Sequence, residues 1–177
     1  MLVLTVQRNE RIKQMFTEGY TPDFSKSRYA FLSPNHTRGY AEVLKELSKK
    51  TDKDFRYGVD SCFWGWVKNP YYDFYPSNEG KSEEDTLFAI VLDVPDEELV
   101  LSDYDKFCNF IERGGDRNFI IDRVEGADCI QCSFWNIDTS RVQAIINLDM
   151  LRKTKMSDIL LSGNNSSSRR ELFKLVG

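Results

Sequence analysis

The sequence predicts a single α+β domain over residues 1–177, with a mixed, mostly antiparallel sheet and two or three helices. Leu87 to Leu92 form an apolar, partly β-branched run without helical spacing, which is typical of a strand buried on both faces. A helix that packs on a core is indicated by apolar residues at i, i+3, i+4 and i+7, namely Tyr40, Val43, Leu44 and Leu47. A chain of 177 residues is long enough to bury one good core and short for two domains.

The N-terminal part predicts two strands, each followed by a helix. Leu2 to Val6 is a short apolar strand, and Asn9 can cap a helix that runs to about Glu18. A second apolar strand is expected at Arg28 to Leu32. Ser33 then caps the core-facing helix, with proline at the first helical position.

The middle of the chain predicts a tryptophan-bearing strand and a long loop. In the segment from Tyr57 to Val67, the two-residue period of a strand places Trp64 and Trp66 on one face. Asn69 to Asp85 is turn-rich and then acidic, and we expect a surface loop or hairpin there, whose aromatic part at 69–78 could cover a ligand.

After the buried strand at 87–92 the chain predicts an acidic corner, a short strand and a helix. Pro95 ends the first strand, and Leu99 to Leu101 form the next. Ser102 can cap the helix that follows. The apolar face of this helix is formed by Tyr104, Phe107, Cys108 and Ile111.

In the C-terminal third, two segments are compatible with either a strand or a helix. Asn118 to Val124 suits either a short strand or the start of a helix, and Cys129 to Trp135 reads as a strand. Val142 to Leu148 is expected to be a strand, with a helix through Met150 as the second choice. Residues 151–177 are basic and serine-rich, and we expect a loosely attached tail with a short helix near its end.

Charge and hydropathy narrow the classes of partner. The net charge of −4 comes with lysine and arginine spread along the chain, which disfavours a broad phosphate-binding face and hence nucleic acid as a partner. No apolar run approaches the roughly 20 residues needed to span a bilayer, and the first residues lack the features of a signal peptide. We therefore expect a cytoplasmic protein without a membrane partner.

The cysteines predict buried thiols rather than a metal site or disulfides. A reducing compartment disfavours disulfides among the four cysteines. Cys129 and Cys132 have C-x-x-C spacing, but a zinc site would need two more ligands, and His36 is the one histidine. The acidic residues between Asp93 and Asp105 stand at a strand end and a helix start, where they are better explained by the helix dipole than by a metal.

Several stretches resemble an uncharacterised bacterial and phage family, a domain of unknown function. They are the first strand with Leu4-Thr5-Val6-Gln7, the FWGWV strand at 63–67, PDEELVLSDYD at 95–105 and IQCSFWNID at 130–138. The four stretches occur in the same order as in that family. This resemblance implies no activity.

The order of elements also resembles the ADP-ribosyltransferase-like fold, a split sheet that binds NAD. In that family a first strand carries an Arg or His that holds NAD, a second strand ends in a small hydroxyl residue, and a late strand presents a catalytic Glu. The corresponding positions here are Thr5 or Gln7, then Ser33, and finally Gln131. The resemblance implies an NAD or nucleotide cleft formed by these residues, in which Trp64 and Trp66 would suit a flat ring.

The departures from that family bear on catalysis. Neither Thr5 nor Gln7 is cationic, and Gln131 can form hydrogen bonds but cannot carry a negative charge. Losing such a preorganised negative charge commonly costs several kcal/mol at the transition state. We expect transferase or NAD glycohydrolase chemistry to be weakened, changed or absent.

Each candidate also has a purely structural reading, and the chain has a rival function. Ser33 is then a helix cap, Trp64 and Trp66 belong to a core, and Gln131 is satisfied by backbone or faces solvent. The rival is a phage or mobile-element module that neutralises a host defence protein through an aromatic, acidic surface such as Trp66 to Tyr75. No P-loop, G-x-G-x-x-G or H-E-x-x-H motif occurs in the sequence.

Overall fold

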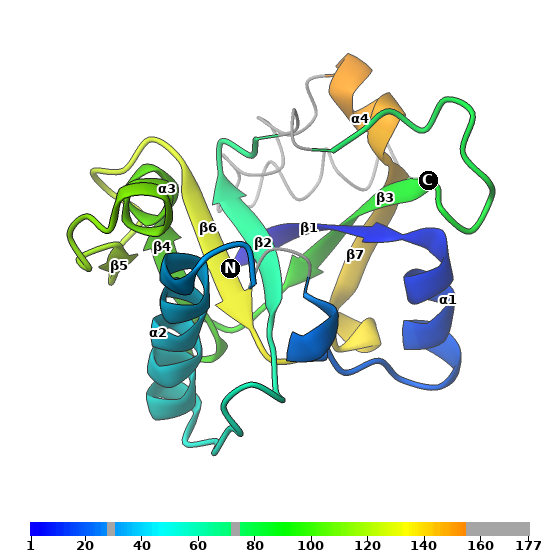
Figure 1. Ribbon diagram of the computed structural model, residues 1–177. Coiled ribbons are helices and arrows are strands. Elements are labelled where there is room, and N and C mark those ends of the chain that lie inside the picture. The colour runs from blue at the N-terminus through cyan, green and yellow to red at the C-terminus, as the bar shows by residue number, and fades with distance from the viewer. Residues whose placement is uncertain (28–30, 72–74, 155–177) are drawn as a thin grey trace. The chain divides into compact units, whose positions relative to one another are not determined.

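A computed structural model describes residues 1–27, 31–71 and 75–154 of the chain (Figure 1). Within them the protein is α+β, with seven strands and four α-helices, which confirms the predicted class and exceeds the predicted number of helices by at least one. The chain divides into two compact units. The first unit comprises Met1–Tyr20, Gly65–Val94 and the chain from Ile137 on, and the second comprises Thr21–Trp64 and Pro95–Asn136. The expectation of a single domain stays a prediction.

The first unit is built on the strand that the sequence specifies most strongly. β3 (Leu87–Asp93) lies between β1 (Leu2–Arg8) and β7 (Val142–Asn147), and both pairings are antiparallel (Figure 1). The end of β2 (Phe63–Lys68) pairs with the other side of β1, antiparallel as well. β3 is buried from Ala89 to Leu92, as its unbroken apolar run predicts.

Two helices belong to the first unit, and both begin directly at strand ends. α1 (Asn9–Thr17) follows β1, but the expected cap at Asn9 is wrong, because Arg8 occupies the cap position without a side-chain hydrogen bond. The loop before β3 satisfies the start of α1 instead, since the Asn9 N–H donates to Thr86 O at 2.9 Å. α4 (Leu148–Thr154) follows β7. The strand prediction at 142–148 is therefore confirmed, and the alternative of a helix there is wrong.

The second unit covers one face of a small sheet with two helices. The strand order is β5 (Ile120–Ile121), β4 (Val100–Asp103), β6 (Ile130–Phe134) and the beginning of β2. α2 (Pro34–Thr51) packs against α3 (Tyr104–Arg113) and against β4 and β6. Their shared core consists of Phe24, Val43, Leu44, Leu47, Cys62, Val100, Phe107, Phe110, Phe119 and Trp135.

Glycine allows α2 and α3 to approach closely. An added Cβ on Gly39 of α2 would lie 3.0 Å from Ile111 Cγ2 and 3.1 Å from Phe107 Cε2, both on α3. A larger residue would therefore push into the neighbouring helix. This contact fixes how two helices cover the sheet.

Two predictions in the second unit are wrong. Ser102 does not cap α3, because Asp103 accepts the hydrogen bond from Lys106 N at 3.1 Å while Ser102 lies fully buried in β4. Phe31 and Leu32, the end of the expected strand at 28–32, form an exposed turn before α2, and residues 28–30 lie outside the described residues.

Shorter elements complete the fold. Single turns of 3₁₀ helix occur at Phe24–Lys26, Asp96–Glu98 and Thr139–Arg141. For 118–124 the sequence allows a short strand or the start of a helix. The strand is confirmed, because Ile120–Ile121 form β5. The expected tail helix falls outside the described residues. No helix in the described part of the chain is long and apolar enough to cross a membrane.

Candidate functional site

The six residues proposed for a nucleotide site divide evenly between the two units. Thr5, Gln7 and Trp66 lie in the first unit, on β1 and β2. The other three, Ser33, Trp64 and Gln131, lie in the second unit, before α2 and on β2 and β6.

In the first unit, Thr5 and Gln7 are in contact and Trp66 is not brought to them. Gln7 Nε2 donates to Thr5 Oγ1 at 3.0 Å, and Thr5 is fully buried. The register pairs Leu4 with Trp66, so the tryptophan lies on the face of the sheet opposite to Thr5 and Gln7. Trp66 is buried there, and its Nε1 donates to Tyr75 Oη at 3.4 Å. The sequence cannot reveal this separation because it depends on strand register.

In the second unit, Ser33 has the capping role that its sequence context indicates. Ser33 Oγ accepts from the backbone N–H of His36 at 3.2 Å and lies 2.9 Å from His36 Nδ1. Both contacts stabilise the first turn of α2. Ser33 can therefore be explained without a ligand.

Gln131 lies opposite a second polar residue on the neighbouring strand. The register of β4 and β6 pairs Ser102 with Gln131, so their side chains stand on the same face. Ser102 is fully buried, and the Oε1 atom of Gln131 is buried as well. Among the residues that the structure describes, neither Ser102 Oγ nor Gln131 Oε1 has a hydrogen-bond partner. Such atoms are rare in proteins, because burying a polar group without a partner costs roughly 1–3 kcal/mol.

Trp64 lies on that same face of the second unit's sheet. β2 and β6 are neighbours, and Phe63 stacks on Phe134 with ring centroids 5.8 Å apart. Trp64 is one residue along β2 from Phe63, and Gln131 is three residues along β6 from Phe134. Because side chains alternate along a strand, Trp64 and Gln131 both point to the opposite face. Cys62 and Ser133 lie on this face as well, and the Ser133 hydroxyl is close enough to the Cys62 thiol to lower its pKa slightly.

Aromatic rings from both helices meet Trp64. Its ring centroid lies 4.9 Å from that of Tyr40 on α2 and 5.3 Å from that of Phe107 on α3. Tyr40 and Trp64 are partly exposed, whereas Phe107 is buried. The helix-covered face therefore carries both an aromatic cluster and the polar pair of Ser102 and Gln131. Sequence reasoning missed Ser102, Tyr40 and Phe107 as members, although Tyr40 and Phe107 stand on the predicted apolar faces of their helices.

The thiol of Cys62, which lies on this face, is not a nucleophile. Burial raises the pKa of Cys62 to about 12, and the nearby Ser133 hydroxyl offsets only part of that effect. The thiol thus stays protonated at neutral pH. All four cysteines are without disulfides, and Cys62, Cys129 and Cys132 are buried, as predicted. In the described ranges no group of three or more potential metal-ligating side chains comes together.

A groove of about 370 Å³ lies elsewhere in the second unit, between the end of α2 and the strands β4 and β5. Three of the four charged residues that line it, Glu46, Lys49 and Lys50, are engaged in contacts with the protein. Lys50 Nζ donates to Leu99 O at 2.6 Å, and Lys49 pairs with Glu46 at 2.6 Å. Both lysines stand in the last turn of α2, where cations favour the helix dipole. The two lysines of the groove can therefore be explained by their contacts within the protein, without a ligand.

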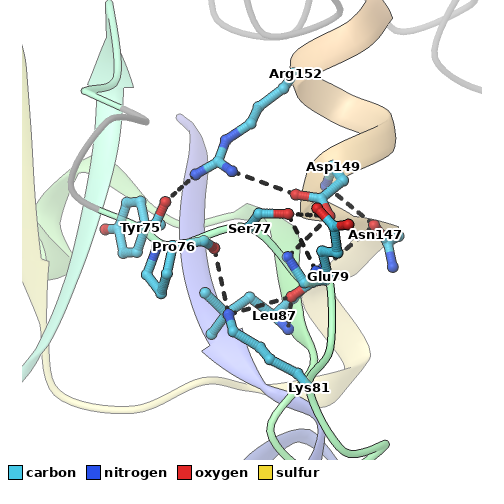
Figure 2. Close-up of polar contacts among 10 residues, drawn as sticks. Tyr75, Pro76, Ser77, Glu79, Lys81, Leu87, Asn147, Asp149 and Arg152 are labelled. Carbon is cyan, nitrogen blue, oxygen red and sulfur yellow. Dashed lines mark hydrogen bonds and ion pairs between the residues drawn. The ribbon is translucent and has the colours of Figure 1, made fainter.

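In the first unit, the loop after β2 is fastened to the start of α4 (Figure 2). The Asn78 side chain accepts from Leu87 N at 2.7 Å and donates to Leu87 O at 3.0 Å, so it bonds both backbone groups of the first residue of β3. Asp149 accepts from Asn78 N at 2.9 Å and from Ser77 Oγ at 3.2 Å. Arg152 bonds both Asp149 and the carbonyl of Tyr75 (Figure 2).

These contacts limit the cover that the sequence predicts at 69–78. The part from Tyr75 to Asn78 is held by side chains of α4 and by the backbone of β3. Residues 72–74 lie outside the described residues.

Comparisons of this chain with protein-family models, with curated proteins and with solved structures give no match.

Proposed function

We propose that this chain binds NAD or a related nucleotide on the helix-covered face of its second unit, through Gln131, Ser102 and Trp64. One observation carries the proposal, namely the buried Gln131 Oε1 that faces Ser102 Oγ across two strands, with no partner for either atom among the described residues. A carboxamide or a ribose hydroxyl could donate to the first atom and accept from the second.

The aromatic cluster supports a ligand with a flat ring. Trp64 and Tyr40 are partly exposed, with ring centroids 4.9 Å apart, so part of the cluster reaches solvent. Nucleotide sites are commonly lined by aromatic side chains with a few polar groups that set orientation. Thr5 and Gln7 satisfy each other in the first unit and are left out of the proposed contact set.

The proposal extends to an ADP-ribosyltransferase-like architecture and to membership of the bacterial and phage domain family that the sequence resembles. For chemistry it assigns binding with catalysis altered or absent. Gln131 is uncharged and cannot stabilise a cationic ribose centre. If the chain is active, the reaction belongs to the transferase or NAD glycohydrolase type, and Gln131→Glu should increase it.

Thermal unfolding with added nucleotides tests the proposal. NAD at 100 times its Kd should stabilise the protein by about 2.7 kcal/mol. Gln131→Ala should abolish this shift. Gln143→Ala is the matched control, because that glutamine lies on β7 of the first unit and donates to Arg141 O at 3.2 Å. Gln7→Ala should also leave the shift intact.

Ser102→Ala gives the sharpest comparison. Removing a buried hydroxyl that lacks a partner should leave the unliganded protein equally stable or more stable. The same change should weaken the nucleotide shift. Absence of any shift with NAD, ADP or AMP in the unmodified protein would overturn the proposal.

A protein partner is the second candidate function, favoured by one exposed aromatic side chain. Tyr71 is exposed, 6.4 Å from the ring of Trp66. Trp66 itself is buried, so it does not belong to the surface that the sequence suggests for such a partner. On this reading Tyr71→Ala should abolish binding of a host protein and leave nucleotide binding unchanged.

A further inference from the structure

Four large apolar side chains of the second unit are exposed around one buried ring. Phe24 is buried, with the ring of Phe31 edge-on at 4.9 Å and that of Tyr57 at 6.4 Å. The Phe24 N–H donates to Val59 O at 3.0 Å, and Leu32 follows Phe31 in the chain. The exposed fractions are 56% for Phe31, 61% for Leu32, 63% for Tyr57 and 48% for Val59. We call these four residues the Phe24 patch.

The patch differs from ordinary surface apolar residues because it is concentrated. Single exposed apolar side chains are normal on soluble proteins. Here four of the eight exposed large hydrophobic residues in the described chain gather at one place. With about 200 Å² for each aromatic side chain and somewhat less for the others, the patch exposes roughly 400 Å². Patches of this size commonly mark an interaction site.

The charges at the rim are balanced and indicate the kind of partner. Asp23 pairs with Lys26 at 3.7 Å, and Arg56 pairs with Asp60 at 2.8 Å. A backbone bridge between Asp23 and Asp60 brings the two ion pairs together. Together these two ion pairs carry no net charge, so they favour neither a strongly acidic nor a strongly basic partner.

A surface with both signs around an apolar centre is complementary to itself. In a dimer with a two-fold axis the same patch meets its own copy, so an acid on one copy can face a base on the other. We propose that the Phe24 patch is the contact surface of a homodimer, with a second copy of this chain as the partner.

The size of the patch sets the strength of this dimer. Two patches would bury roughly 800 Å² of apolar surface, and the rim adds to this. Stable interfaces usually bury about 1,200–2,000 Å² in total. The dimer is therefore weak and should form reversibly with concentration.

Sedimentation velocity of the full chain from about 1 to about 300 µM tests the proposal, because association follows mass action. The unmodified protein should shift from monomer to dimer over this range. Phe31→Ser and Tyr57→Ser should each weaken the dimer at least about tenfold. Phe16→Ser is the matched control, because Phe16 is also half exposed but lies on α1 of the first unit. It should leave the dimer unchanged.

A second measurement does not depend on weakening the contact. Tyr57 lies on the patch, so Tyr57→Cys under mild oxidation should give a disulfide-linked dimer, whereas Phe16→Cys should not. A protein that stays monomeric at the highest concentration overturns the proposal. So does a dimer that the Phe31 and Tyr57 changes leave as strong as before.

Discussion

Gly39→Ala tests the helix contact that covers the candidate site. In an open helix the change would stabilise the protein by about 1 kcal/mol, because alanine favours helix more than glycine. Here the new methyl group would lie 3.0 Å from Ile111 Cγ2 and 3.1 Å from Phe107 Cε2. Relieving such overpacking costs about 1–3 kcal/mol. We therefore expect a net loss of about 1 kcal/mol in the free energy of unfolding, and a larger loss for Gly39→Val.

Urea unfolding followed by circular dichroism measures this change. Ser48→Ala in the same helix is the control, because it tests helix preference at a half-buried position away from α3 and should give a small gain. Because Phe107 also contacts Trp64, Gly39→Ala should weaken nucleotide binding as well. A stabilisation of about 1 kcal/mol would show that α2 and α3 do not approach closely and would refute the reasoning.

Three further predictions concern hydrogen bonds and a thiol. Asn78→Ala should destabilise the protein by about 2 kcal/mol in urea unfolding, because it removes two bonds to Leu87, and a loss below about 0.5 kcal/mol would contradict the network. Asp103→Ala should cost about 1 kcal/mol as the loss of a helix cap. Ser102→Ala serves as its control and should cost nothing. The pKa of Cys62 is raised, so its protonated form is favoured in the folded protein; stability should fall as pH rises above the ordinary value of 9.0, by up to about 1.4 kcal/mol per pH unit, and native Cys62 should resist thiol reagents at pH 8.

The strongly patterned elements could be predicted from sequence because their side chains alone determine them. The run at 87–92 and the stripe on α2 bury enough apolar surface to fix their type in any context. The caps were less certain, because Ser102 and Asp103 are both good capping residues and strand register decides between them. α4 was missed because its apolar residues, Leu148 and Leu151, follow directly on a strand of similar composition.

The candidate site was predicted only in part for a similar reason. Alternation along a strand suffices to place Trp64 and Trp66 on one face, but their partners depend on which strands lie beside them. The register of Leu4 with Trp66 separates that tryptophan from Thr5, and the pairing of Ser102 with Gln131 adds a residue that no local pattern indicates. Contacts between distant segments cannot be read from one sequence.

The indole N–H signals of the three tryptophans test the central claim most directly, in a nitrogen-15 NMR spectrum recorded with increasing NAD. Trp66 Nε1 donates to Tyr75 and Trp135 Nε1 donates to Thr51 at 2.9 Å, so both indoles already have a protein partner and neither belongs to the proposed contact set. NAD should shift the Trp64 signal, identified by its loss in Trp64→Phe, and leave the other two in place. A Trp64 signal that stays unchanged at millimolar NAD, or a shift of Trp66 alone, would contradict nucleotide binding beside Gln131.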